Sequence, residues 1–266
     1  MTTAVAPGFE WHESAAGRVL QSSRLAALAP HVFTTRDRRF RDDTTTDDEA
    51  RLAATLGMPP ARVIRARQVH GRTVLVATSE DLSPDREADA IVTLDPTVAI
   101  AVRVADCVPI LMADRHGRAV AAVHAGWRGA CAGVVIAAVE ALAERGVAPA
   151  DLVVAIGPSI GACCYQVDDR VRNAFLACTP ALRRSSGQAL RRSAGQAASW
   201  FTADGPGHWR LDQWRANVDQ LVSAGVPADA IAVSGVCTAD HLDTCFSYRK
   251  EGPATGRMVA AIRIRT

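Results

Sequence analysis

Three segments of the chain place reactive side chains beside glycine at the ends of strand-like runs. They are QVHG at residues 68–71, ADCVPIL at 105–111 and HAGWRG at 124–129. The ends of strands are common places for functional groups. His70, Cys107 and His124 together offer two imidazoles and one thiolate, a donor set that Zn²⁺ accepts in sites that keep a fourth position open for water.

A metal held in this way would do hydrolytic chemistry. Zn²⁺ lowers the pKa of a bound water to about 7, which supplies a hydroxide nucleophile at neutral pH. The three residues lie 37 and 17 positions apart, so only the fold can bring them together. For each residue alone, a buried cysteine or a capped histidine is the commoner explanation. The shared metal site is therefore a hypothesis.

The elements that must position these residues follow from hydrophobic patterning. Short apolar or alternating runs predict strands at 32–36, 73–78, 90–94, 98–104, 108–113, 118–124, 151–157, 231–236 and 258–264. Helical spacing and capping signals predict helices from Asp47 to about Gly57, and over 129–145, 168–178 and 211–224. The first thirty residues show little pattern beyond a possible opening strand. Clustered strands with interspersed helices indicate an α+β or layered α/β domain.

Composition narrows the class of protein. The 266 residues are 48% hydrophobic and 22% charged, which is typical of a globular chain with a sizeable core. Thirty basic residues nearly cancel 28 acidic ones, so we expect no nucleic-acid partner. No apolar run approaches the ~20 residues of a membrane-spanning helix. No secretory signal is visible, so we expect a cytoplasmic protein with seven reduced cysteines.

One internal repeat is present. LRRSSGQA at 182–189 recurs as LRRSAGQA at 190–197. Its composition predicts a duplicated surface insertion, and the lack of aromatic residues disfavours a nucleic-acid-binding finger. The adjacent Cys163 and Cys164 form a poor chelate and only a strained bridge, so we expect them to pack in the interior.

The three reactive segments, in this order, resemble the YfiH-like family, which is often labelled as polyphenol oxidase or laccase-domain proteins. The resemblance continues through AIGPSIGACCYQVDDRV at 155–171, Cys237-Thr238 and FSYRKEGPATGRM at 246–258. It spans about residues 68–264 in five ordered motifs.

The resemblance implies a fold, a site and an activity. The fold would be a single-domain α+β sandwich of four layers, α-β-β-α, with mixed sheets. The site would be a zinc centre of His70, Cys107 and His124. The chain would phosphorolyse adenosine, inosine, guanosine and methylthioadenosine to base and (thio)ribose 1-phosphate, and would deaminate adenosine to inosine. Its partners would be these small molecules and phosphate, with no obligate protein partner.

Phosphorolysis also requires a phosphate site, which calls for arginine and backbone N–H groups. Candidates are Arg128, Arg249 and Arg257, each of which could instead be structural or solvated. Asp106 has two interpretations: it orients a ligand histidine or moves protons, or it caps a turn.

Other functions compete with this one. Cys107 could be the nucleophile of a cysteine hydrolase, activated by His124 and oriented by His70 or Asp106. A non-catalytic zinc protein would normally offer a fourth protein ligand, which the motifs lack. A zinc hydrolase of a cell-wall precursor is a further alternative. A copper polyphenol oxidase is disfavoured, because four coppers need about ten histidines with His-x-His pairs, and the chain has seven histidines without such a pair.

Overall fold

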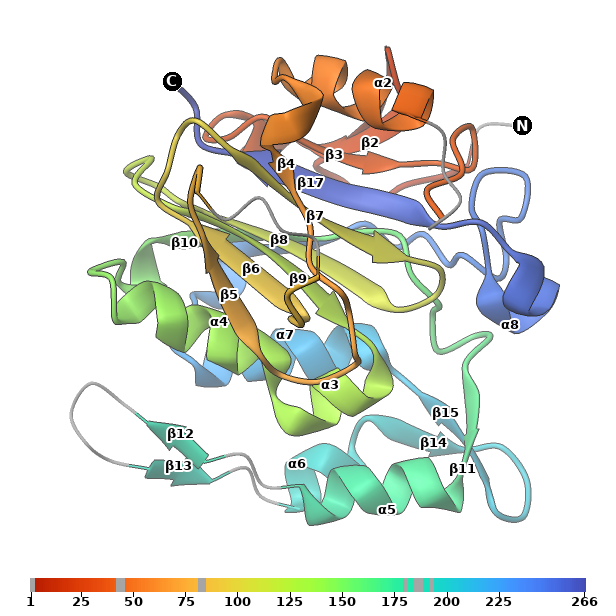
Figure 1. The fold of residues 1–266 in the computed structure, drawn as a ribbon. Coiled ribbons are helices and arrows are strands. Elements are labelled where there is room, and N and C mark those ends of the chain that lie inside the picture. The colour runs from red at the N-terminus through yellow and green to blue at the C-terminus, as the bar shows by residue number, and fades with distance from the viewer. Residues whose placement is uncertain (1–2, 42–45, 81–84, 179–180, 184–188, 192–193) are drawn as a thin grey trace.

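The computed structural model describes residues 3–41, 46–80, 85–178, 181–183, 189–191 and 194–266. Two six-stranded sheets lie face to face between layers of helices (Figure 1). In order across the first sheet, the strands are β1 (Phe9–Ser14), β2 (Gly17–Ser22), β3 (His31–Thr34), β17 (Met258–Arg263), β7 (Ala99–Val104) and β4 (Val63–Ile64). In the second sheet they are β16 (Ile231–Val233), β10 (Leu152–Ile156), β8 (Val108–Asp114), β9 (Val120–Ala125), β6 (Ala90–Thr93) and β5 (Val74–Ala77).

Helices cover the outer faces of both sheets. The helices of the described residues are α1 (Ser23–Ala26), α2 (Thr46–Leu56), α3 (Trp127–Ala132), α4 (Val134–Ala143), α5 (Asp169–Ala177), α6 (Ala194–Ala198), α7 (Gln213–Ser223) and α8 (Tyr248–Glu251). Short 3-10 turns are η1 (Pro60–Arg62), η2 (Pro149–Asp151), η3 (Ala228–Ala230) and η4 (Gly252–Ala254). A smaller sheet of β11 (Gln166–Asp168), β15 (His208–Leu211) and β14 (Phe201–Ala203) packs with α5.

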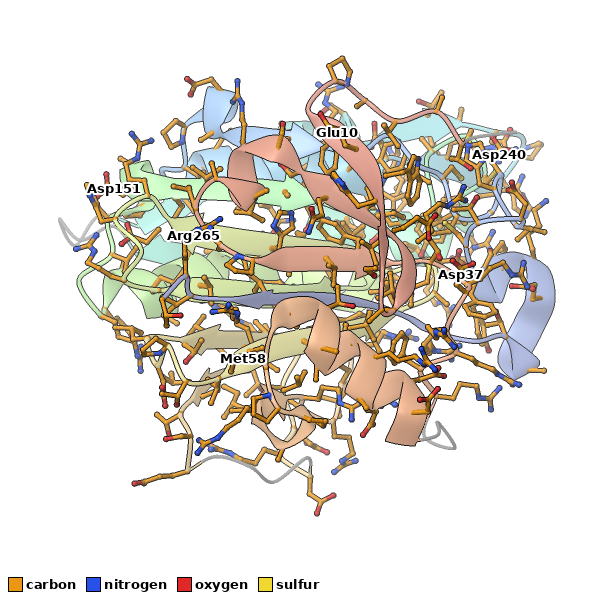
Figure 2. All side chains as sticks on the ribbon, turned by 90° about the horizontal axis from the view of Figure 1, so that it is seen from above. Glu10, Asp37, Met58, Asp151, Asp240 and Arg265 are labelled. Carbon is orange, nitrogen blue, oxygen red and sulfur yellow. The ribbon has the colours of Figure 1, made fainter. Side chains whose placement is uncertain are left out.

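Successive side chains of each strand point to opposite faces of its sheet. They form three interfaces, one between the two sheets and one between each sheet and the helices that cover it. In β7, Ile100 and Val102 face the other sheet, while Ala99 and Ala101 face α2. In β8, Leu111 faces the first sheet and its neighbours Ile110 and Met112 face α4. Figure 2, seen from above, shows Met58 beside α2 on the outer layer, where it packs against the same cluster as Ala99 and Ala101.

Both large sheets are mixed. In the first sheet only the β4–β7 pair is parallel, and in the second the β10–β16 and β5–β6 pairs are parallel. The predicted α+β sandwich with mixed sheets is therefore confirmed. No helix in the part of the chain that the structure describes is long and apolar enough to cross a membrane.

One sequence prediction about elements was wrong and another was incomplete. The helix expected over 129–145 is two helices, α3 and α4, because Gly133 between them has a left-handed backbone (φ 80°) that ends one helix and begins the next. The sequence suggested only a possible opening strand within the first thirty residues, whereas the structure has a β1–β2 hairpin there, whose strands show mixed exposure.

The repeat at 182–197 is described only in part. Strands β12 (Ala181–Arg183) and β13 (Ala189–Arg191) form an antiparallel hairpin at the periphery (Figure 1), whereas residues 184–188 and 192–193 lie outside the described residues. Near the end of the repeat, Ala197 in α6 is buried against Phe175 and Trp200, so the repeat also contributes to the interior.

Candidate metal centre and its pocket

Cys107 and His124 are brought together by two neighbouring strands. Cys107 directly precedes β8, and His124 lies near the end of β9. The strands pair antiparallel, with Pro109 opposite His124 and Val108 opposite Ala125. All residues of both strands are buried, so this register is set by hydrophobic packing on both faces of the sheet.

His70 comes from the loop between β4 and β5. Its backbone has a left-handed conformation (φ 61°), which is unusual for a residue with a side chain and costs about 1–3 kcal/mol. The buried carboxylate of Asp89 stabilises this turn, because it accepts hydrogen bonds from the N–H groups of His70 (2.9 Å) and Gly71 (2.6 Å). The loop is thereby held in the conformation that directs His70 toward the other two residues.

Asp89 also orients His124. Its Oδ1 lies 2.8 Å from His124 Nδ1, and its backbone carbonyl accepts the N–H of His124 at 2.7 Å. Asp89 directly precedes β6, which pairs with β9, so the strand register places the two residues side by side. With Nδ1 occupied by the carboxylate, Nε2 of His124 is the atom left to bind a ligand.

The three predicted ligand residues therefore converge. One ligand atom of each lies within 4.8 Å of the others, and Cys107 Sγ is 4.0 Å from His70 Nε2. The rings of His70 and His124 meet edge to face with centroids 4.9 Å apart. Gly126 allows this approach, because a Cβ there would lie 2.8 Å from His70 Cδ2 and 3.1 Å from Cys107 Sγ.

The charges of the site favour a thiolate. Burial raises the pKa of the Cys107 thiol, but the charges and hydrogen bonds of His124 and His70 together outweigh it and lower that pKa to about 6. For His124, burial lowers the pKa, whereas the Cys107 thiolate and the hydrogen bond to Asp89 raise it to about 9. Burial also raises the pKa of Asp89, but hydrogen bonds from His124 and Gly71 hold it below its usual value. A deprotonated thiol is the form that binds metal.

Asp106 contacts different partners. Its Oδ1 accepts the hydroxyl of Thr238 and its Oδ2 accepts the backbone N–H of Arg249, both at 2.6 Å. Its backbone is left-handed, with φ 81°. Asp89, rather than Asp106, therefore contacts His124, and Asp106 joins the Cys107 loop to the C-terminal segment.

The centre opens into a pocket of about 840 Å³. Arg128, Arg249 and Arg257, the three predicted phosphate ligands, all line it. Each guanidinium lies over an aromatic ring: Arg128 over Trp127 at 4.4 Å, Arg249 over Tyr165 at 5.1 Å and Arg257 over Tyr248 at 5.9 Å. Stacking of this kind fixes the plane of a guanidinium. Arg249 also donates to the carbonyl of Gln166 at 2.8 Å, and Arg257 to that of Gly256 at 2.9 Å.

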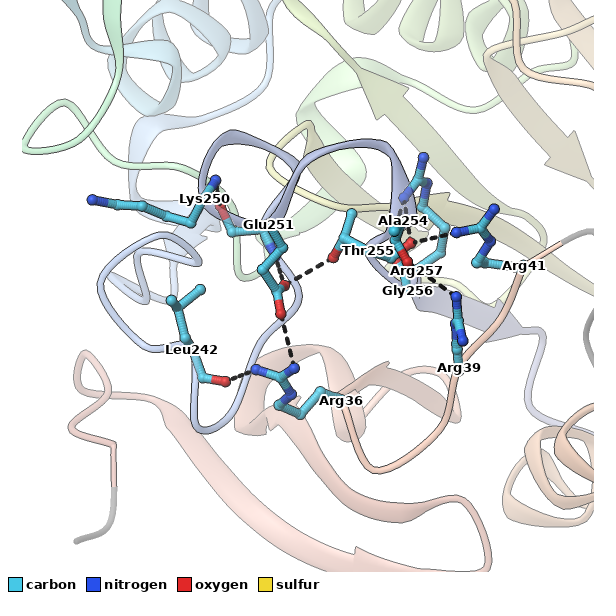
Figure 3. A network of polar contacts seen from close by, with 11 residues as sticks. Arg36, Arg39, Arg41, Leu242, Lys250, Glu251, Ala254, Thr255, Gly256 and Arg257 are labelled. Atoms are coloured by element: carbon cyan, nitrogen blue, oxygen red, sulfur yellow. Dashed lines mark hydrogen bonds and ion pairs between the residues drawn. The ribbon is translucent and has the colours of Figure 1, made fainter.

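Further arginines, which the sequence analysis did not single out, line the same pocket: Arg41, Arg67 and Arg103. Figure 3 shows how Arg41 and Arg257 are held, since both donate to the backbone carbonyl of Thr255. Glu251 supports this loop, because it pairs with Arg36 at 2.9 Å and accepts the hydroxyl of Thr255 at 2.8 Å. Asp106 is the one carboxylate among the lining residues, so the pocket is strongly cationic and suits an anionic ligand.

Asp89 is the main functional residue that sequence reasoning missed. It stands in DREADAIV, where an acidic residue before a strand is unremarkable. A signal was nevertheless present, because a charged residue at the start of an entirely apolar strand must be buried with partners. Tyr165, which lies in the matched motif after β10, likewise gave no sign of facing the pocket.

Comparisons with known proteins identify the family of the chain. A family model described as multi-copper polyphenol oxidoreductase laccase matches residues 34–265. A Geobacillus stearothermophilus protein named purine nucleoside phosphorylase YlmD is 36% identical, over 83% of this chain and 80% of its own length. A Streptomyces coelicolor protein named as a purine nucleoside phosphorylase is 38% identical, over 79% of this chain and 78% of its own.

Solved structures share the fold over nearly the whole chain. A Bacillus licheniformis protein, described as the hypothetical protein YfiH, superposes with a TM-score of 0.82 at 26% identity and covers 98% of this chain and 100% of its own. YlmD from Geobacillus stearothermophilus superposes with a TM-score of 0.79 at 31% identity, over 93% of this chain and 96% of its own.

Proposed function

The chain belongs to the multi-copper polyphenol oxidoreductase laccase family, with YfiH and YlmD as relatives, and from this premise we propose that it is a zinc-dependent purine nucleoside phosphorylase that also deaminates adenosine. The observation that carries the proposal is the convergence of His70, Cys107 and His124 at an arginine-lined pocket. Relatives with the name purine nucleoside phosphorylase support the reaction class.

The residues present fit a zinc ion. Two imidazoles and a thiolate of lowered pKa match its preferred donors, and a fourth position facing the pocket would remain for water or substrate. When bound, the metal would act as a Lewis acid and would lower the pKa of a water molecule on it to about 7. His70, Cys107 and His124 would hold it, and Asp89 would keep His124 in the tautomer that presents Nε2.

Phosphate binding falls to the arginines. Arg128, Arg249 and Arg257 would hold inorganic phosphate beside the ribose, so that one of its oxygens forms a bond to C1′ as the bond from C1′ to the purine nitrogen breaks. The leaving base takes up a proton, and products are free base and ribose 1-phosphate. Asp106 acts as a positioning residue in this scheme, because it holds the backbone of Arg249.

Deamination uses the same pocket. Water adds to C6 of adenosine and ammonia leaves, which gives inosine. Trp127, Tyr165 and Tyr248 line the cavity and offer flat apolar surfaces against which a purine could stack. The order of preference among adenosine, inosine, guanosine and methylthioadenosine depends on contacts to the exocyclic groups of the base.

The test is metal content and turnover measured on the same samples. We expect about one zinc per chain in the wild type, and both phosphate-dependent cleavage of inosine and release of ammonia from adenosine. Cys107→Ala should lose the zinc and both reactions while its circular dichroism spectrum stays unchanged. Wild-type turnover in a folded, metal-free Cys107→Ala protein would refute the proposal.

A cysteine hydrolase is the second candidate, favoured by the ion pair that Cys107 and His124 can form. It requires catalysis in the metal-free protein, with Cys107 as nucleophile and His124 as base. Removal of zinc with a chelator separates the two functions. Loss of activity and its return on adding zinc supports the phosphorylase, whereas activity that survives chelation and is abolished by alkylation of Cys107 supports the hydrolase.

A further inference from the structure

A second group of sulfur ligands lies on the loops that follow β10 and β16. Cys163, Cys164 and Cys237 place their sulfur atoms within 4.8 Å of one another. The two loops are joined by a parallel bridge between Ser159 and Cys237, and the N–H of Thr238 donates to the carbonyl of Ser159 at 3.1 Å. The expectation that Cys163 and Cys164 simply pack in the interior is wrong for Cys163, which is exposed.

The three thiols lie at the edge of a small apolar cluster, to which Cys237 and Cys164 contribute together with Ile160 and Ala239. Cys237 is buried at the base, Cys164 is half-buried and Cys163 is open to solvent, so an ion could enter from the surface. The N–H of Gly161 donates to Cys237 Sγ at 3.3 Å, a contact that stabilises negative charge on sulfur. Gly161 is required there, because a Cβ would lie 3.0 Å from the Trp214 ring and 3.2 Å from Cys163 Sγ.

We propose that Cys163, Cys164 and Cys237 bind one monovalent copper ion, Cu⁺, through three sulfur atoms. A set made only of soft sulfur donors suits Cu⁺, zinc and iron–sulfur clusters, whereas carboxylate donors suit harder ions. Zinc in a sulfur-rich structural site takes four protein ligands, and the group found among the described residues has three.

A bound cation would stabilise the three thiolates, which otherwise repel one another. Binding of Cu⁺ therefore displaces thiol protons into solvent and changes no oxidation state.

The group is connected to the metal centre through Asp106. Ile160, three residues before Cys163, donates its N–H to the carbonyl of Asp106 at 3.0 Å. Thr238, next to Cys237, donates its hydroxyl to the carboxylate of Asp106. An ion held between the two loops would thus cross-link the wall of the pocket beside Cys107.

The experiment is a competition for Cu⁺ under anaerobic conditions. The zinc-loaded full-length protein is titrated into the coloured complex of Cu⁺ with bathocuproine disulfonate, and loss of colour measures transfer. We expect the wild type to withdraw one Cu⁺ per chain while it retains its zinc. Cys163→Ser and Cys164→Ser, each checked for folding by circular dichroism, should withdraw none.

Two controls locate the ion. Cys178→Ser changes a half-buried cysteine outside the cluster, and Cys107→Ala changes the other metal centre; both should withdraw Cu⁺ as the wild type does. X-ray absorption of the copper-loaded protein should show sulfur ligands alone. The proposal is overturned if the wild type withdraws no Cu⁺, if Cys107→Ala abolishes withdrawal, or if nitrogen ligands are found.

Discussion

The His70–Cys107–His124 centre and the Cys163–Cys164–Cys237 cluster both gather three ligand atoms within 4.8 Å, yet they are built differently. The first combines nitrogen with sulfur, is supported by the buried Asp89, and opens into the cationic pocket. The second consists of sulfur alone, and the backbone N–H of Gly161 donates to one of its sulfur atoms. Supporting groups, more than proximity, therefore decide whether a set of ligands is poised for acid–base chemistry.

The largest contrast should come from removing one ligand from each group. His124→Ala deletes the ligand that Asp89 orients, so we expect complete loss of zinc and of both proposed reactions. Cys164→Ser should keep both, because Cys164 does not line the pocket. Zinc analysis and turnover of inosine with phosphate measure the difference. Equal losses in the two variants would show that the two groups act as one site.

The second largest contrast should be in the reactivity of the thiols of Cys107 and Cys163. In the metal-free protein at pH 7.5, Cys107, with a pKa of about 6, is mostly thiolate, whereas Cys163, with a pKa of about 12, is almost entirely protonated. The thiolate of a more acidic thiol is a weaker nucleophile, which offsets part of this difference in thiolate fraction. Alkylation of Cys107 should therefore be on the order of a hundredfold faster than that of Cys163.

The alkylation rates of the two thiols should also depend on pH in different ways. The rate at Cys107 should rise as the pH increases through about 6 and then level off, while the rate at the more exposed Cys163 should keep rising across the neutral range. Peptide mapping by mass spectrometry after iodoacetamide treatment measures both. Faster modification of Cys163 would mean that exposure, not the charge of His124, governs reactivity here.

Asp89→Asn should weaken the first centre without abolishing it. An amide retains the shape but loses the charge that holds the turn at His70 and the tautomer of His124, so zinc affinity should fall by roughly 10- to 100-fold. Competition with a zinc chelator measures this, and Asp95→Asn serves as a matched control because Asp95 caps a distant turn. Unchanged affinity in Asp89→Asn would remove Asp89 from the metal centre, and Cu⁺ withdrawal should be unaffected in both variants.

The smallest effect is expected at the exposed thiol. Cys163→Ser should keep kcat/KM for inosine within about twofold of wild type in copper-free buffer, since surface substitutions outside a site change little. A loss of tenfold or more there would show that the cluster supports turnover even without an ion.

Much of the sandwich could be predicted from local pattern. The strands between residues 90 and 125 alternate or run apolar because both faces are buried, and α2 begins with acidic residues and ends before Gly57. The break at Gly133 was missed because apolar residues continue on both sides of it, so only the backbone angle distinguishes one helix from two. The β1–β2 hairpin was missed because its strands show mixed exposure.

The sequence by itself determined which residue types were available, namely two histidines and a cysteine at strand ends, arginines in the matched motifs, and an adjacent cysteine pair. Only the tertiary structure decided which of them share a site. Asp89 meets His124 through strand pairing across 35 positions, and Cys237 meets Cys163 through a bridge between loops 74 positions apart in the chain. Such contacts depend on sheet register and loop closure, which arise from the packing of the whole core and leave no trace in local spacing.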